Sequence, residues 1–304
     1  MSKQNLDEDY KNEDFSSLPK SMEELLKNNP KQNIQNPAEI YNHTDPDKES
    51  QYPTEIIDLP SHGLVYPSSN PLSIGTIEMK YMTAKEEDIL TSQNLVRKGV
   101  VIDKLLRSMI VSRINYDDLL LGDKNAIIVA ARILAYGGDY PVEQKCPSCG
   151  EINHFSIKLT EFDDKEINYD LLNKDNIYDY ILPNSKIPIT FKLLTIADDK
   201  NVDAELRGLK KIQDTSKNKS NIDPEFSTRL KYIITSVNGN TDLKIVRLFV
   251  ESMLSKDTFE FRKHLAKMTP NLDMSYLFEC SECDYTTRLT MPMTTEFFWP
   301  KSDV

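Results

Sequence analysis

The sequence has few glycines and no long hydrophobic run, and these absences exclude several classes of protein. Only nine of its 304 residues are glycine, which is few for a chain built around the glycine-rich loops that bind phosphates. The motifs of nucleotide-binding proteins, serine hydrolases and zinc proteases do not occur in it. No run of about eighteen apolar residues occurs either. We therefore expect neither an enzyme nor a membrane-spanning protein.

The N-terminus and the net charge narrow these classes further. The first residues have neither the basic flank nor the apolar stretch of a signal peptide, so we expect a protein of a reducing cytoplasm. The formal net charge is −11, whereas nucleic-acid affinity depends on lysine and arginine side chains that neutralise phosphates. We therefore expect no nucleic acid among its partners.

All of the cysteines stand in two C-x-x-C pairs. Cys146 and Cys149 form the first pair, and Cys280 and Cys283 form the second. Two such turns together supply a tetrahedral shell of thiolates for zinc, and a complete shell leaves no open position for a catalytic water. We predict one structural zinc per chain with these four ligands, although shells of four cysteines also bind iron.

Two alternatives to this site stay open. In the first, the pairs are unmetallated thiols or a redox couple, but the strand-like sequences on both sides of each pair favour metal-binding turns. In the second, His154 replaces a cysteine as a ligand, since its spacing from the first pair resembles that of a zinc knuckle. Because four cysteines are available, we favour a solvated histidine on a strand.

The separation of the two pairs indicates an internal duplication. A compact zinc ribbon separates its pairs by roughly fifteen to twenty residues, whereas residues 150–279 intervene here. We align the halves at Cys146 and Cys280. Asp123 then falls on Asp257 without a gap, and each aspartate stands before a stretch with helical spacing of apolar residues. We predict two copies of one unit, with each aspartate capping its helix.

Further upstream, residues 77–88 match residues 189–200. In both segments an alternating strand pattern leads into a helix that starts with a capping-box sequence. The capping pairs are Thr83 with Glu86 and, in a weaker form, Thr195 with Asp198. The second half is longer, and we place its insertion in the polar residues 213–225. A helix with Pro224 in its first turn is expected to run to Val237.

These patterns predict an α+β fold made of two repeats. Each repeat reads strand, capped helix, second helix, third helix, strand, C-x-x-C turn and strand. We divide the chain into a disordered acidic and polar tail (1–53), a first repeat (54–165) and a second repeat with the insertion (166–304). If the repeats pack about a pseudo-twofold axis with their cysteine turns in contact, one shared zinc-ribbon-like site joins them.

Apolar residues near both ends of the chain could either bind a partner protein or pack within the chain itself. In the tail, Leu25 and Leu26 lie on one face of a short capped segment, which is typical of a tail that folds onto a partner or of a transient helix. Phe297, Phe298 and Trp299 form an aromatic cluster near the C-terminus. We expect this cluster to close over the chain's own core, with anchoring of a neighbouring protein as the alternative.

A series of segments between residues 57 and 300 carries a further similarity. The segments are, in order, IDLPSHGLVYP, MTAKEEDIL, LLLGDKNAIIVAARILAYG, DYPVEQKCPSCG, FECSEC and FFWP. Together they resemble the baseplate hub proteins of T4-like contractile-tailed bacteriophages. The resemblance implies a non-enzymatic structural protein of the virion, or an assembly factor, that belongs to the tail baseplate and is assembled in the host cytoplasm.

The resemblance also implies the kind of partner. Other baseplate and hub proteins of the phage are the expected partners, and tail assembly would set the oligomeric state. Two alternative functions remain beside it. One is a zinc-ribbon adaptor that binds nucleic acid or the transcription machinery, and the other is an assembly chaperone that is absent from the mature virion.

Overall fold

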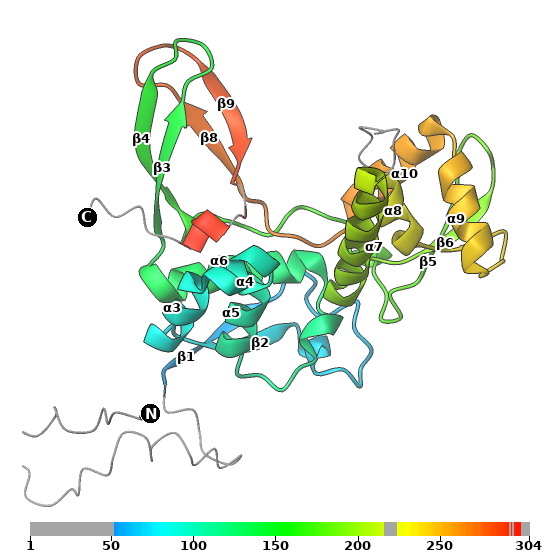
Figure 1. Ribbon diagram of the computed structural model, residues 1–304, viewed down its shortest axis with the longest axis horizontal. Helices are drawn as coiled ribbons and strands as arrows, with labels where there is room; N and C mark the ends of the chain where they lie inside the picture. The colour runs from blue at the N-terminus through cyan, green and yellow to red at the C-terminus, as the bar shows by residue number, and fades with distance from the viewer. Residues whose placement is uncertain (1–51, 216–223, 292, 294, 299–304) are drawn as a thin grey trace, which may run out of the picture. The chain divides into compact units, whose positions relative to one another are not determined.

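The computed structural model describes residues 52–215, 224–291, 293 and 295–298. This part of the chain contains eight α-helices and four small antiparallel sheets (Figure 1), so the predicted α+β class is confirmed. The tail predicted for residues 1–53 lies outside the described residues except for its last two positions, and so do Leu25 and Leu26. None of the helices in the described ranges is long and apolar enough to cross a membrane.

The first half of the described chain starts with a hairpin and continues with helices. Strand β1 (Thr54–Asp58) pairs with β2 (Thr76–Lys80), and the 3₁₀-helix η2 (Pro71–Ile74) lies between them in sequence. The helices that follow are α3 (Ala84–Thr91), α4 (Gln93–Lys98), α5 (Val101–Met109), η3 (Tyr116–Asp118) and α6 (Leu121–Tyr136). A second hairpin consists of β3 (Asp139–Lys145) and β4 (Ile152–Lys158). The prediction of a strand, a capped helix, two further helices and the strands beside the cysteine turn holds for this half in outline, but the structure adds strand β1 and has four α-helices in place of three.

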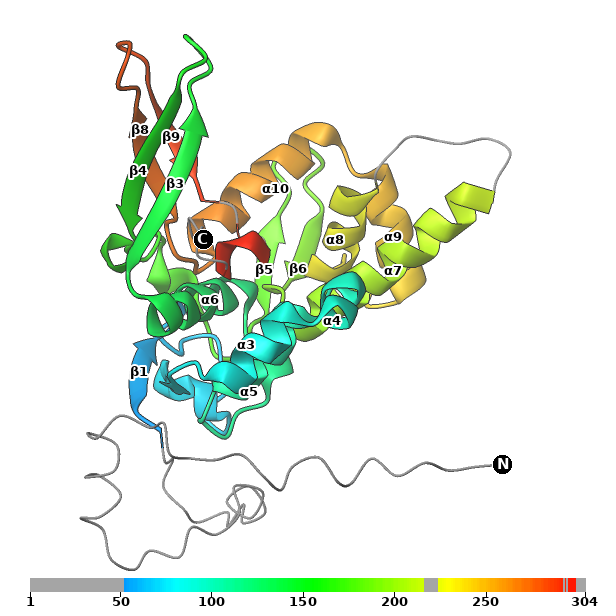
Figure 2. The ribbon, with the colours of Figure 1, turned by 60° about the vertical axis from the view of Figure 1, so that its left-hand side comes forward.

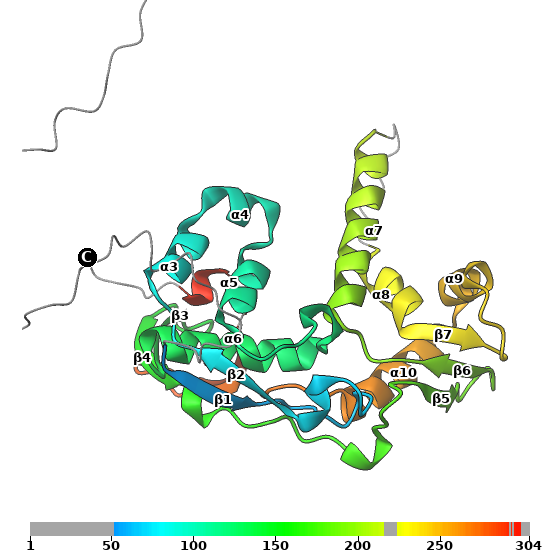
Figure 3. The ribbon, with the colours of Figure 1, turned by 90° about the horizontal axis from the view of Figure 1, so that it is seen from below.

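The second half contains a three-stranded sheet and four α-helices. After η4 (Leu159–Glu161) and η5 (Tyr169–Leu171), the sheet has the order β5 (Tyr178–Ile181), β6 (Pro188–Phe191) and β7 (Ile234–Val237). The helices are α7 (Ile196–Thr215), α8 (Glu225–Ile233), α9 (Leu243–Ser252) and α10 (Ser255–Met268). The last hairpin has strands β8 (Ser275–Glu279) and β9 (Thr286–Thr290), followed by η6 (Thr295–Phe298). Figure 3 shows the sheet with α8, α9 and α10 gathered around it.

One predicted helix is in fact a helix followed by a strand. The sequence pattern predicts one helix that runs to Val237, but α8 ends at Ile233 and β7 pairs with β6 from Ile234 onward. The residues Ile-Thr-Ser-Val of β7 include three with β-branched side chains, which favour strands. Strand β6 lies more than forty residues before β7 in the chain, and pairing with it therefore overrides the local helical pattern.

Helix α6 lies at the centre of the core. Its side chains are apolar almost all round, and Ile127 and Ala131 are fully buried. A helix without a polar face is stable only where other elements cover it on most sides. Leu105 and Leu106 of α5 are also fully buried in the same core.

The aromatic residues near the C-terminus belong to this core. Phe297 and Phe298 are 1% and 0% exposed, and the ring of Phe297 stacks on that of Tyr140 with centroids 5.2 Å apart. They are therefore core residues of this chain and are not free to anchor a partner. Trp299 lies outside the described residues.

Both predicted capping boxes are present. The Thr83 amide donates to the Glu86 carboxylate at 3.1 Å, and in the second half the Thr195 amide donates to the Asp198 carboxylate at the same distance. A lysine also pairs with each carboxylate: Lys80, the last residue of β2, pairs with Glu86 at 2.9 Å, and Lys192, which directly follows β6, pairs with Asp198 at 2.7 Å. The starts of α3 and α7 are therefore built in the same way.

The aspartates predicted to cap the third helix of each repeat have a different role. Helix α6 begins at Leu121 and α10 begins at Ser255, so Asp123 and Asp257 each lie at the third position of the first turn. The residues at the N-cap are leucines, and they make no side-chain capping bond. Both aspartates are fully buried, and each side chain binds a loop that is distant in sequence.

Each of these carboxylates holds the loop that follows a Leu-Pro pair. Asp123 accepts hydrogen bonds from the amide (2.9 Å) and hydroxyl (2.8 Å) of Ser61 and from the hydroxyl of Tyr66. Asp257 accepts them from the amides of Asn184 (2.8 Å) and Ser185 (3.0 Å) and from the Asn184 side chain (3.0 Å). In both halves the start of the long helix is thus tied to the loop between the first two strands.

The two halves meet where the start of α6 passes the residues that follow β6. The Leu121 amide donates to the Leu194 carbonyl at 3.2 Å, and the Ile196 amide donates to the Leu119 carbonyl at 2.8 Å. These two bonds form an isolated antiparallel bridge in which Leu120 of the first half lies opposite Thr195 of the second half. The contact is made by unlike segments of the two halves.

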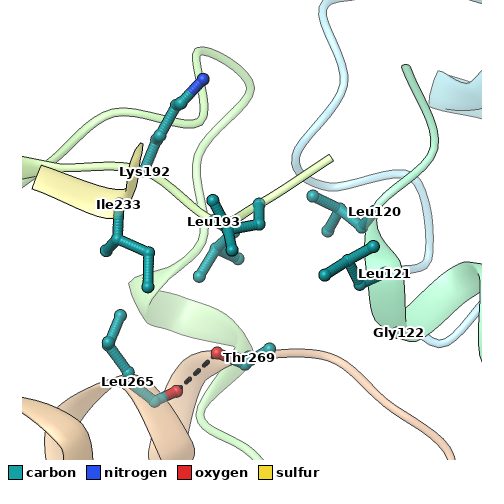
Figure 4. A pocket seen from close by; sticks show the side chains of 9 residues that line it. Leu120, Leu121, Gly122, Lys192, Leu193, Ile233, Leu265 and Thr269 are labelled. Carbon is teal, nitrogen blue, oxygen red and sulfur yellow. Dashed lines mark hydrogen bonds between the residues drawn. The ribbon is translucent and has the colours of Figure 1, made fainter. Parts of the chain in front are cut away.

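An ion pair and a pocket lie near the same contact. Lys200 of α7 pairs with Asp117 of η3 at 2.5 Å. A mostly apolar pocket of about 140 Å³ lies between the halves. Figure 4 shows Leu120 on its first-half side, with Leu193 and Leu265 on its second-half side.

Candidate metal centre

The four cysteines lie at the ends of two hairpins that stand side by side (Figures 1 and 2). One cysteine pair connects β3 to β4, and the other connects β8 to β9. Aromatic side chains pack between the hairpins. The ring centroid of Phe155 lies 6.0 Å from the ring centroid of Tyr276 and 6.0 Å from that of Phe278. The packing of these rings therefore brings together two turns that are far apart in the sequence.

Each turn between the strands is closed by backbone hydrogen bonds. In the first hairpin the Cys146 amide donates to the Glu151 carbonyl at 2.8 Å, and the Gly150 amide donates to the Cys146 carbonyl at 3.0 Å. Gly150 has φ = +83°, which a residue with a side chain adopts with strain. In the second hairpin the Cys280 amide donates to the Tyr285 carbonyl at 3.1 Å. The two turns thus point their cysteines toward the same point.

The four sulfur atoms all lie within 4.8 Å of one another. The sulfur of Cys146 is 3.8 Å from that of Cys283, and the sulfur of Cys149 is 3.6 Å from that of Cys280. A disulfide bond has a sulfur separation of about 2.05 Å, so these pairs are not bonded. Zinc–sulfur bonds of about 2.3 Å in a tetrahedron place the sulfurs about 3.8 Å apart. The arrangement therefore fits a tetrahedral metal ion.

The thiols of this cluster differ in their affinity for protons. At Cys280 the amide of Glu282 is the main cause that lowers the pKa of the thiol, to about 6. At Cys149 the Glu151 amide acts in the same direction, but desolvation and the neighbouring thiols outweigh it and raise the pKa to about 12. Zinc binds thiolates, so loading of this site releases the remaining protons.

Asn153 connects the two hairpins directly beside the cysteines, and the sequence analysis did not identify it. Its side-chain amide donates to the Cys280 sulfur at 3.6 Å, and its side-chain oxygen accepts from the Ser281 amide at 2.7 Å. The residue is only 6% exposed. Its place on β4, on the inward side of the strand, is the one sequence signal that points to it. Such an outer contact fixes the orientation of a metal ligand.

His154 follows Asn153 on β4 and points to the other side of the strand, where it is exposed. Among the residues that the structure describes, the four cysteines are the group of metal-binding side chains close enough to hold an ion, and His154 is not part of it. The alternative in which His154 replaces a cysteine is therefore not supported.

The four cysteines together form the ligand set of a closed structural metal site that joins two hairpins. Four thiolates fill the coordination shell of a tetrahedral metal, so no position is left for a substrate or a reacting water. A bound ion would connect residues on both hairpins and therefore both halves of the chain. The site can hold two parts of the protein together.

Comparison with known proteins identifies the family. Residues 55–299 match the family described as T4 bacteriophage base plate protein. No curated protein and no solved structure matches the chain. The match covers both cysteine-bearing hairpins, all eight α-helices of the described residues and nearly all of those residues. The chain therefore belongs to the T4 bacteriophage base plate protein family.

Proposed function

We propose that this chain is a structural or assembly protein of the tail baseplate hub of a contractile-tailed bacteriophage. The observation that carries the proposal is the family match over residues 55–299. In this role the chain is assembled in the host cytoplasm, occupies the baseplate of the virion tail and contacts other baseplate and hub proteins. It acts by these contacts and not by catalysis.

A structural zinc ion clamps the two halves in this proposal. Its ligands are Cys146, Cys149, Cys280 and Cys283, and the sulfur separations of 3.6 and 3.8 Å support a tetrahedral site. The metal closes a long loop of chain, so that metal binding and folding are coupled. When bound, the ion would supply two metal–sulfur bonds to each hairpin, and the rest of the chain keeps a fixed shape for its partners.

The proposal also includes an internal duplication, from residues 54–165 to residues 166–304. Three parallels support it. The starts of α3 and α7 share a capping box and a lysine pair. Asp123 and Asp257 hold equivalent Leu-Pro loops. The leucines that precede α6 and α10 have nearly the same backbone angles.

Mass spectrometry of the phage's purified particles and of its tail-assembly intermediates tests the hub assignment. We expect the chain in both samples, and in baseplates that have been separated from tails. Detection in the intermediates alone would identify an assembly chaperone that leaves before the virion is complete. Absence from both samples would contradict the proposal.

A further inference from the structure

The contact between the halves is made by two unlike segments, and each segment has a counterpart in the other half. Residues 119–121, the helix-start segment, pair with residues 194–196, the strand-exit segment. In the alignment of the halves these correspond to residues 253–255 and 82–84. Within the described residues, no backbone hydrogen bond joins the two counterparts to each other. The second half therefore has a helix-start segment, and the first half a strand-exit segment, that are not used inside the chain.

Leu254 has the conformation of Leu120 but not its burial. Both residues precede the first turn of a helix, with φ and ψ of −62° and 135° at Leu254 and of −64° and 152° at Leu120. Leu120 is 2% exposed in the contact between the halves, whereas Leu254 is 55% exposed. The second half thus displays on its surface an apolar side chain whose counterpart is buried.

The main-chain groups needed for the same two hydrogen bonds are also free. In the part of the chain that the structure describes, the Ser255 amide and the Met253 carbonyl form no backbone hydrogen bond, and neither do the Ala84 amide and the Met82 carbonyl. Ser255 and Ala84 are the first residues of their helices, so the helix gives their amides no acceptor. Each unused segment therefore offers one donor and one acceptor.

A groove lies beside one of these segments, and exposed acidic side chains lie beside the other. The groove has a volume of about 260 Å³ and lies beside Met253, with Phe226 and Arg262 among its lining residues. Phe226 is 44% exposed. On the other face, α3 exposes Glu87 and Asp88 next to the strand-exit segment. The helix-start segment of the second half thus lies beside a groove that has one arginine in its lining, and the strand-exit segment of the first half lies beside two exposed carboxylates.

We infer that a second copy of this chain docks head to tail on these surfaces. Residues 253–255 of one copy pair with residues 82–84 of the next in the antiparallel bridge seen inside the chain. The Ser255 amide then donates to the Met82 carbonyl, and the Ala84 amide donates to the Met253 carbonyl. In this head-to-tail arrangement each copy uses its helix-start segment on one neighbour and its strand-exit segment on another, so the contact is heterologous and generates a ring or an open chain of copies. The inference rests on the duplication within the proposed function.

Two substitutions block one surface each with little effect on the fold. Leu254→Asp places a charge on the helix-start surface at an N-cap position, where aspartate favours the helix. Ala84→Pro removes the amide donor at the first position of α3, where proline is tolerated. Leu277→Asp is the control, because Leu277 is 62% exposed on β8 and lies outside both segments. Circular dichroism of each variant establishes that it is folded.

Sedimentation of the full-length chain, measured over concentrations up to about 0.1 mM, supplies the readout. We expect the wild type and Leu277→Asp to self-associate, and either blocking substitution to raise the dissociation constant at least about tenfold. An equimolar mixture of the two blocked variants should form dimers, since each retains the surface that the other lacks.

A monomeric wild type, unchanged association of Leu254→Asp, or a mixture that behaves like its components would each overturn the head-to-tail contact. Measuring the zinc content of the same samples distinguishes a failure of the head-to-tail contact from a failure of the proposed function. A monomer that holds one zinc and occurs in baseplates would reject self-association alone. If the chain self-associates but contains no zinc, the proposed zinc site is wrong and the head-to-tail contact is still supported.

Discussion

The sulfur atoms of Cys149 and Cys280 lie 3.6 Å apart although the two residues are 131 positions apart in the sequence. No local element brings them together. Their approach depends on the packing of two hairpins from different halves of the chain, through Phe155 and its neighbours. Binding of a metal at this point therefore reports on the tertiary arrangement of the protein as well as on its cysteines.

Removal of the Asn153 side chain should weaken metal binding without preventing it. Asn153→Ala deletes the hydrogen bond to the Cys280 sulfur and leaves the Ser281 amide without its acceptor. We expect zinc affinity, measured by competition with a chelator, to fall about ten- to hundredfold. His154→Ala is the control, because the exposed His154 side chain should leave the affinity unchanged.

The two buried aspartates should have parallel effects on stability. Asp123→Ala leaves the amide and hydroxyl of Ser61 and the hydroxyl of Tyr66 buried without an acceptor, which should lower the free energy of unfolding in urea by about 2–4 kcal/mol. Asp257→Ala should lower it as well. The exposed Asp88→Ala should change it by less than about 0.5 kcal/mol. Equal behaviour of the Asp257 and Asp88 variants would contradict the parallel roles.

Two glycines in helices should respond oppositely to the same substitution. A side chain at Gly122 would place its Cβ 1.8 Å from the Pro270 carbonyl oxygen, so Gly122→Ala should destabilise the chain by about 1–3 kcal/mol or more. At Gly208 of α7 a Cβ would meet no described atom within 4 Å. Gly208→Ala should stabilise the chain by about 0.5–1 kcal/mol. Thermal unfolding of both variants checks the two signs.

The buried Glu86 should make stability depend on pH. Burial raises its pKa, but hydrogen bonds from Ser108, Thr83 and Lys80 together outweigh burial and lower the pKa to about 2, from an ordinary value of 4.5. The folded-state pKa lies below the unfolded one, so this contribution is complete above about pH 4.5 and is lost as the pH falls toward 2.

Glu86→Gln tests this dependence. The variant should be less stable than the wild type at neutral pH, and the difference in the free energy of unfolding should shrink as the pH falls below about 4.5. The exposed neighbour Glu87 provides the matched control, Glu87→Gln. A difference between Glu86→Gln and the wild type that stays constant down to about pH 3 would show that the carboxylate's charge is not responsible.

The sequence predicted the features that short segments determine. The capping boxes at Thr83 and Thr195 and the strands beside each cysteine turn are local patterns, and they were found where they were expected. The proximity of the cysteine pairs was predicted by chemistry, since two half-sites of one metal must meet. Burial of Phe298 followed from its apolar surroundings.

Long-range contacts were the features that local patterns did not reveal. Asp123 and Asp257 stand at helix starts, where capping is the ordinary role of aspartate, and nothing near them in sequence indicates the loops that they bind. Strand β7 exists because β6 lies beside it. Asn153 became identifiable only when the second hairpin was placed against β4. In each case the deciding partner lies far away in the sequence.

The measurement that tests the central claim most directly is the metal content of the purified full-length chain, determined by elemental analysis beside Cys146→Ser and Cys280→Ser. A shared site predicts one zinc per chain in the wild type, with loss of zinc and of thermal stability in both variants, although each changes only one hairpin. Absence of metal from the wild type, or loss of metal in only one variant, would contradict a clamp that joins the two halves.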